Sequence, residues 1–113
     1  MTNPEIHIVH VHAAASVPTE ALPQLVSHSI AAAAPEAPVV VDLTALTSIT
    51  PWGCDLLIDV IAGAATSREI AVVASSLDVR LELILCGLDQ IVPLVHTPEE
   101  AASVVRVRVG VCR

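Results

Sequence analysis

The chain has no lysine, and its 113 residues include only five arginines against twelve acidic side chains. The formal net charge is −7 at pH 7. Proteins that bind nucleic acid follow the phosphate backbone with clustered basic residues, so we expect no nucleic-acid ligand. The absence of lysine also excludes a P-loop and Schiff-base chemistry, because both need its amine.

Glycine and cysteine are scarce as well. The four glycines form neither a G-x-G-x-x-G dinucleotide fingerprint nor a G-x-S-x-G nucleophile elbow. No nucleophile stands beside a base, so we expect a protein that is not an enzyme and has no cofactor. Cys54, Cys86 and Cys112 are odd in number and widely spaced, which favours reduced packing residues over disulfides or a zinc site.

The sequence contains no Phe or Tyr and a single tryptophan, Trp52. Hydrophobic residues still make up 54% of the chain, so the core must consist of Val, Leu, Ile and Ala. This composition excludes disorder, and the length suffices for one domain that folds without a metal or disulfide. We therefore expect residues 1–113 to form a single domain, with 106–113 as a candidate tail.

Long apolar runs and targeting signals are also missing. The charge-free stretch 21–35 is interrupted by proline and polar residues, so we expect no membrane span. Residues 1–15 lack the basic segment that opens a secretory signal. We expect a soluble, cytoplasmic protein.

Strand-like and helix-like patterns alternate along the chain, which predicts a small α/β protein. The predicted strands cover residues 5–12, 39–43, 70–74 and 91–95. The predicted helices cover residues 22–33, 51–66, 76–88 and a last segment that begins after Thr97 with Pro98 and a capping Glu100. Residues 105–109 alternate again, as a strand would.

The segment 76–88 is the ambiguous one. If Ser76 caps a helix there and Gly87 ends it, an apolar face results. That face contains Leu81, Ile84, Leu85 and Leu88. The same segment also alternates at Leu81, Leu83 and Leu85, as a strand would.

Residues 39–57 combine a strand, a loop and a helix start. The continuous apolar run 39–43 is typical of a central strand, Thr50 is a good N-cap, and Pro51 is favoured at the first helical position. Trp52 then shares a helix face with Asp55, Asp59 and Thr66. The opposite, apolar face contains Leu56, Leu57, Val60, Ile61 and Ala64. Trp52 either fills a gap near the sheet edge or anchors a recognition surface.

Other polar residues have plainer interpretations. His10 and His12 share a strand face, but without a third ligand they indicate the polar side of an edge strand rather than a metal site. Asp42 ends a central strand, as phosphorylated aspartates do in receiver-like folds. Because no lysine can assist such chemistry, we expect a structural carboxylate bonded to nearby backbone N–H groups.

Several of these segments, in this order, resemble the STAS domain, which occurs in anti-sigma factor antagonists and in sulphate-transporter tails. The similarity covers roughly residues 5–105. It is carried by Val39-Val40-Val41-Asp42-Leu43, Gly53, Cys86-Gly87-Leu88-Asp89, Ile91-Val92-Pro93-Leu94 and Thr97-Pro98-Glu99-Glu100-Ala101. The resemblance implies a mixed sheet of four to five strands with helices packed mainly on one face. It also implies an anti-sigma factor, often a Ser kinase, as partner.

The sequence departs from the family at the switch loop, which usually reads Asp-Ser-Ser-Gly with a phosphorylated second Ser. Thr50-Pro51-Trp52-Gly53 stands there instead, so the phosphoacceptor position is Trp52, which cannot be phosphorylated. Ser48 and Thr50 are weak substitutes. The turn after the first strand also differs, since Ala13-Ala14-Ala15-Ser16 replaces the usual polar, Gly-containing turn.

Two functions follow from these observations. The first is a non-enzymatic interaction module that acts in bacterial transcription regulation, with carboxylates that favour a basic partner. Its expected partner surface is Thr50, Pro51, Trp52, Gly53, Asp55 and Asp59. The second is a small-ligand module in which residues 50–53 close a nucleotide or lipid pocket. Homodimerisation stays open.

Overall fold

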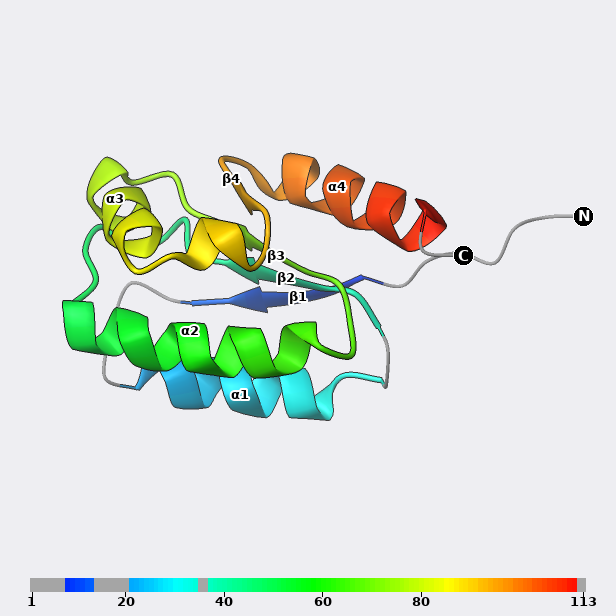
Figure 1. Ribbon diagram of the computed structural model, residues 1–113, viewed down its shortest axis with the longest axis horizontal. Helices are drawn as coiled ribbons and strands as arrows, with labels where there is room; N and C mark the ends of the chain where they lie inside the picture. The colour runs from blue at the N-terminus through cyan, green and yellow to red at the C-terminus, as the bar shows by residue number, and fades with distance from the viewer. Residues whose placement is uncertain (1–7, 14–20, 35–36, 112–113) are drawn as a thin grey trace, which may run out of the picture.

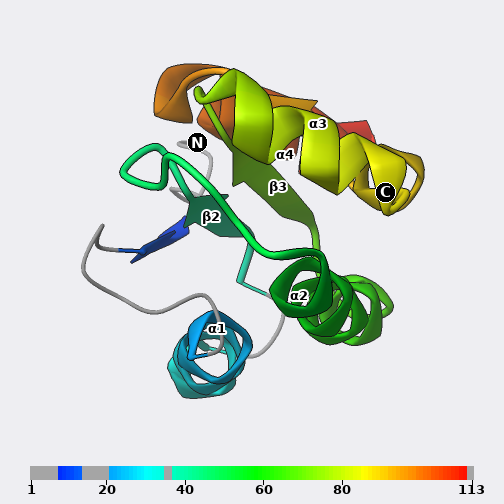
Figure 2. The ribbon, with the colours of Figure 1, turned by 90° about the vertical axis from the view of Figure 1, so that its left-hand side faces the viewer.

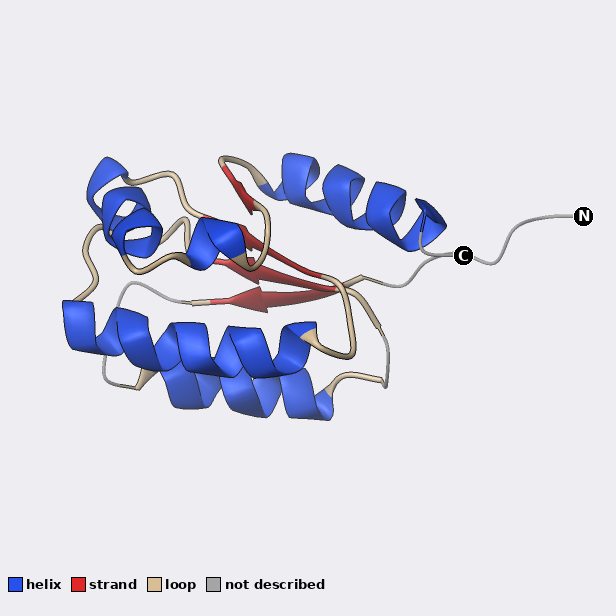
Figure 3. Ribbon diagram, in the orientation of Figure 1, coloured by secondary structure: helices blue, strands red, loops and turns tan. Residues whose placement is uncertain are grey.

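The computed structural model describes residues 8–13, 21–34 and 37–111. Within them, four strands form one sheet in the order β1-β2-β3-β4 (Figures 1 and 3). The strands are β1 (Val9–His12), β2 (Val39–Asp42), β3 (Ile70–Val73) and β4 (Leu94–Val95). The helices are α1 (Leu22–Ala32), α2 (Pro51–Ala65), α3 (Leu77–Leu85) and α4 (Pro98–Val111), with a 3-10 turn η1 (Leu88–Gln90). The predicted α/β class is confirmed.

The helices cover both faces of the sheet unequally. Helices α1 and α2 lie side by side on one face, whereas α4 lies on the other (Figure 1). Inner side chains of α3 and η1 join the core formed by α1, α2 and the sheet. The prediction that helices pack mainly on one face is therefore confirmed, with α4 as the exception.

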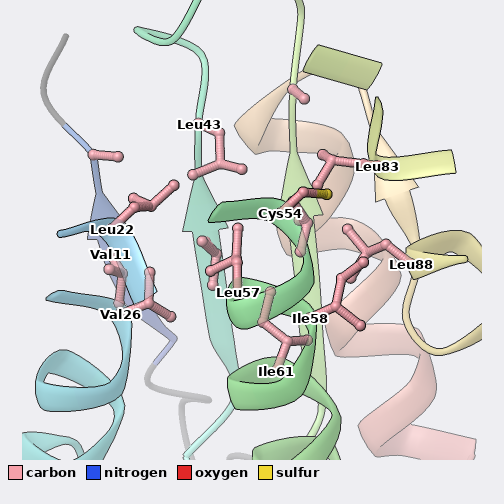
Figure 4. Packing of buried hydrophobic residues seen from close by; sticks show 14 of the residues in the cluster. Val11, Leu22, Val26, Leu43, Cys54, Leu57, Ile58, Ile61, Leu83 and Leu88 are labelled. Carbon is pink, nitrogen blue, oxygen red and sulfur yellow. The ribbon is translucent and has the colours of Figure 1, made fainter. Parts of the chain in front are cut away.

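Strand β2 shows why its sequence is a continuous apolar run. Val39 and Val41 belong to the larger core under α1 and α2, and Val40 belongs to the smaller core under α4. All three are fully buried, because successive strand residues point to opposite faces and both faces are covered. Figure 4 shows the larger core, in which side chains of α2 meet those of α3 and η1.

The sheet differs from the prediction in strand direction and length. The resemblance implies a mixed sheet, but the three pairings among the described strands are all parallel. Each of these strands is connected to the next by a helical crossover, as parallel pairing requires. Strand β4 has only two residues of the predicted 91–95, and residues 5–7 of the first predicted strand lie outside the described part of the chain.

Helix α4 begins as predicted and ends later. Thr97 Oγ1 accepts a hydrogen bond from Glu100 N–H at 3.1 Å, and Glu100 Oε1 accepts one from His96 N–H at 3.3 Å. The alternation in 105–109 predicts a strand, which is wrong, because α4 continues to Val111. Ala101 and Val105 lie one turn apart and are both buried against the sheet, so helical spacing decides the outcome.

The ambiguous segment 76–88 forms α3 and η1, with Gly87 between them. Gly87 has a φ of 89°, in the left-handed region where glycine is unstrained, so the predicted stop is confirmed. The inner face of α3, Val79 and Leu83, is fully buried. We call Leu77, Leu81, Ile84 and Leu85 the outer face of α3, because each is exposed, by 42 to 81%. The predicted apolar face consists of Leu81, Ile84, Leu85 and Leu88. The first three residues point away from the core, and only Leu88 is buried.

Candidate functional site

The first turn of α2 is held by its N-cap. Thr50 has an extended backbone, and its Oγ1 accepts a hydrogen bond from Gly53 N–H at 3.1 Å. Pro51 occupies the first helical position, where its missing N–H costs nothing. The helix start predicted at residues 50–51 is confirmed, and it fixes the backbone that carries Trp52.

Trp52 is exposed over 63% of its surface, and Asp55 and Asp59 are exposed as well. The exposure excludes the interpretation of Trp52 as a gap-filling core residue. The predicted apolar face of α2 is rotated in the structure, because Cys54 and Ile58 are buried whereas Leu56 is only half-buried. Leu57 and Ile61 are fully buried, as the helical spacing suggests. The remaining two predicted residues, Val60 and Ala64, are half-buried next to α1.

The loop before α2 and the start of α3 are fastened to the carboxyl ends of the strands. Ser76 Oγ donates to the Thr47 carbonyl at 3.1 Å, which joins that loop to α3. The Arg80 guanidinium donates to the carbonyls of Ala74 and Val95 at 2.9 and 3.0 Å. As a result, α2 starts and α3 lies at one end of the molecule, which faces the viewer in Figure 2.

Two thiols hydrogen-bond to Glu82 of α3, and the one on Cys54 joins α2 to α3. Cys54 Sγ donates to the Glu82 carbonyl at 3.7 Å, and Cys86 Sγ donates to Glu82 Oε2 at 3.7 Å. Burial raises the pKa of the Cys54 thiol far above its ordinary value, and burial also raises the pKa of Cys86. The neighbouring Cys54 and Asp55 side chains shift the pKa of Cys86 in opposite directions, Cys54 lowering it and Asp55 raising it. Both thiols are therefore neutral at physiological pH, and Cys54 is the packing residue that the sequence predicts. Cys112 lies outside the described residues.

Asp42 has the structural role predicted for it. Its side chain is 5% exposed, and Oδ1 accepts a hydrogen bond from Thr44 N–H at 2.9 Å. Oδ2 lies 3.1 Å from Nδ1 of His12, a partner that sequence reasoning missed. The β1–β2 register places these two residues opposite each other, and no short-range pattern reveals a register.

His10 and His12 are exposed on β1, at the edge of the sheet as described, and their rings stack with centroids 6.2 Å apart. Among the described residues, no three His, Cys, Asp or Glu side chains form a group that could hold a metal ion. Within the same ranges, no helix is both long and apolar enough to cross a membrane.

Two surface hollows are described, and neither is lined by residues 50–53. The larger, of about 380 Å³, lies between α1 and α2. Its lining is Ser27, Ile30, Ala31, Asp59, Val60, Gly63, Ala64 and Arg68. The smaller, of about 320 Å³, is lined by Ala21, Gln24, Leu25 and His28 of α1 and the residue before it. Of the predicted partner surface, only Asp59 lines either hollow.

No protein-family model matches the chain. No curated protein matches it either. Among solved structures, the chain is similar to a candidate anti-sigma factor antagonist from Thermotoga maritima, with a TM-score of 0.66. The two are 19% identical, over 88% of this chain and 87% of that chain. This likeness shows a shared fold, which agrees with the fold class implied by the STAS resemblance.

Proposed function

We propose that this protein is a non-enzymatic interaction module of the anti-sigma factor antagonist type. It binds an anti-sigma factor or a related regulator through Thr50, Pro51, Trp52, Asp55 and Asp59, in the cytoplasm, as part of bacterial transcription regulation. Gly53, which sequence reasoning also assigns to this surface, is buried and supports it through the N–H that it donates to Thr50. The observation that carries the proposal is the exposed Trp52 on a rigidly capped helix start. The shared fold with a candidate antagonist supports the class of protein.

Trp52 has the properties of an interface anchor. A large, rigid aromatic side chain gives much apolar contact for little loss of conformational freedom, and such residues dominate interface energies. The Thr50 cap and Pro51 fix the turn before binding, which lowers the ordering cost of association. Asp55 and Asp59 on the same exposed side favour a partner with basic residues around an apolar pocket.

The module works without the serine switch of related antagonists. A phosphate at the first turn of a helix would be favoured by the helix dipole, but an indole cannot accept one. Thr50 is a poor substitute because its Oγ1 already accepts the capping hydrogen bond. Ser48 is exposed in the loop, as Thr50 is, but it is not the residue that caps α2. Binding by this module is therefore not controlled at residue 52.

The proposal is tested by calorimetric titration with anti-sigma factors of the kinase type from the same genome. Trp52→Ala should weaken binding by about 30-fold, or about 2 kcal/mol, as for a central aromatic anchor. Gln24→Ala, at an exposed position on α1, is the matched control and should bind like the original protein. Equal affinity of the Trp52→Ala and Gln24→Ala variants would contradict the proposal.

The groove between α1 and α2 supports a second candidate function, the binding of a small ligand such as a nucleotide or lipid. Its volume of about 380 Å³ is within the range of ligand pockets. That function predicts a ligand carried through purification, which native mass spectrometry would detect as added mass. The mass of the bare chain would count against it.

A further inference from the structure

The outer face of α3 is an apolar surface that this fold leaves uncovered. Leu77, Leu81, Ile84 and Leu85 follow the spacing i, i+4, i+7, i+8, which places them on one side of the helix. Their exposed fractions run from 42% at Ile84 to 81% at Leu85. Single exposed leucines are ordinary, but four large apolar side chains on one helix face mark an interaction site.

The inner face of α3 shows that this exposure is not a sign of a loose helix. Val79 and Leu83 are fully buried. Arg80 hydrogen-bonds to two strand-end carbonyls, and Ser76 Oγ hydrogen-bonds to the preceding loop. Helix α3 is therefore fixed in its orientation, and the outer face is presented to solvent by a rigid support.

Charges beside the outer face are acidic. Asp78 and Glu82 lie one turn apart on α3, and the Glu82 carbonyl accepts a hydrogen bond from Cys54 Sγ of α2 at 3.7 Å. Asp55 of α2 lies close enough to Cys86 at the end of α3 to raise the pKa of its thiol. The basic residue of α3, Arg80, has its guanidinium bound to main-chain carbonyls. A partner for this surface must supply both apolar side chains and positive charge.

We infer that the outer face of α3 docks an amphipathic helix of a partner protein, with leucine-like side chains flanked by Lys or Arg. A second copy of this chain is the less suitable occupant. Its own outer face carries the same carboxylates, and a net charge of −7 on each copy opposes close approach. The inference rests on the proposed function, because it adds a second contact for the same regulatory partner.

The test uses an amphipathic peptide of Leu and Lys at helical spacing, titrated into the ¹⁵N-labelled full chain and followed by NMR. The largest shifts should fall on residues 77–85. Binding should weaken with added salt, and a peptide with Glu in place of Lys should bind at least about ten-fold more weakly.

Variants localise the contact. Leu81→Gln with Leu85→Gln should lower peptide affinity by at least about ten-fold, whereas Leu25→Gln on α1 should leave it within about two-fold. Asp78→Asn should weaken binding more than Glu99→Gln on α4. Because Leu81 and Leu85 are exposed, their variants should remain folded, which circular dichroism verifies.

Three results would overturn the inference. The first is a set of NMR shifts located outside α3, and the second is equal affinity for the Lys and the Glu peptide. The third is self-association of the chain that Leu81→Gln abolishes, which would make a second copy the occupant. The assay contains no anti-sigma factor, so its failure would leave the role of Trp52 standing. Conversely, a Trp52→Ala variant with normal anti-sigma factor affinity would leave the α3 surface standing.

Discussion

Helix α3 has two apolar faces that differ in their surroundings. Its inner face, Val79 and Leu83, is closed off by the core, whereas its outer face exposes Leu81 and Leu85 by 50 and 81%. The start of α2 repeats this contrast, since Cys54 is buried and Trp52, two residues earlier, is exposed. We therefore propose that apolar residues at this end of the molecule serve two purposes, stability on the inside and recognition on the outside.

The largest expected effect comes from emptying the inner face. Leu83→Ala should lower the free energy of unfolding by about 2–5 kcal/mol, because it leaves a cavity among fully buried side chains. Leu81→Ala, on the outer face of the same helix, should change it by about 0.5 kcal/mol or less. Urea unfolding measures both. Similar losses for the two variants would remove the distinction between the faces.

Alkaline pH should lower the free energy of unfolding through Cys54, which is buried on α2. Burial raises the pKa of this thiol in the folded protein above its ordinary value of 9.0, so the unfolded chain loses its proton first. The stabilising contribution of the protonated thiol is fully present below pH 9. Above that pH the free energy of unfolding falls, with a slope that approaches about 1.4 kcal/mol per pH unit. The chain has no Lys or Tyr to titrate in this range, so the thiols dominate. Urea unfolding from pH 8 to 11 measures the slope, and Cys54→Ala should reduce it. An unchanged slope would show that Cys54 is not protected.

A smaller loss of stability is expected from changes to the N-cap of α2, the helix start that carries Trp52. Thr50→Ala removes the oxygen that accepts the Gly53 N–H bond and should lower the free energy of unfolding by about 1 kcal/mol. Thr50→Ser keeps that oxygen and should recover most of the loss. If both variants were equally stable, the cap would not be what holds this turn.

We expect no phosphorylation at residues 50–53, the start of α2. Trp52 has no hydroxyl, and the Thr50 hydroxyl is engaged as the cap. Phosphopeptide mapping after incubation with an anti-sigma factor of the kinase type should find these four residues unmodified. Stoichiometric phosphate on Thr50 would overturn this expectation and would make the loop a switch again.

Local signals in the sequence predict much of this arrangement. The apolar run 39–43 identifies a covered strand, and Thr50 with Pro51 identifies the start of α2, because strand burial and helix capping depend on neighbouring residues. Periodicity also places Trp52 away from the apolar side of α2.

Features that depend on distant parts of the chain could not be predicted. In α3, Leu81 and Leu83 are equally apolar, and only the position of α3 against α2 and the sheet decides which one is buried. The pairing of His12 with Asp42 needs the β1–β2 register. The alternation in residues 105–109 predicts a strand, and packing of Val105 against the sheet selects a helix instead.

Fluorescence of Trp52 tests the central contrast most directly, because it is the chain's only Trp and no Tyr contributes. The account predicts red-shifted emission that acrylamide quenches readily in the free protein. It also predicts that Trp52→Ala changes the free energy of unfolding by well under the roughly 3–5 kcal/mol of an emptied core site. Blue-shifted, protected emission with a large loss of stability would place Trp52 in the core and contradict the recognition surface.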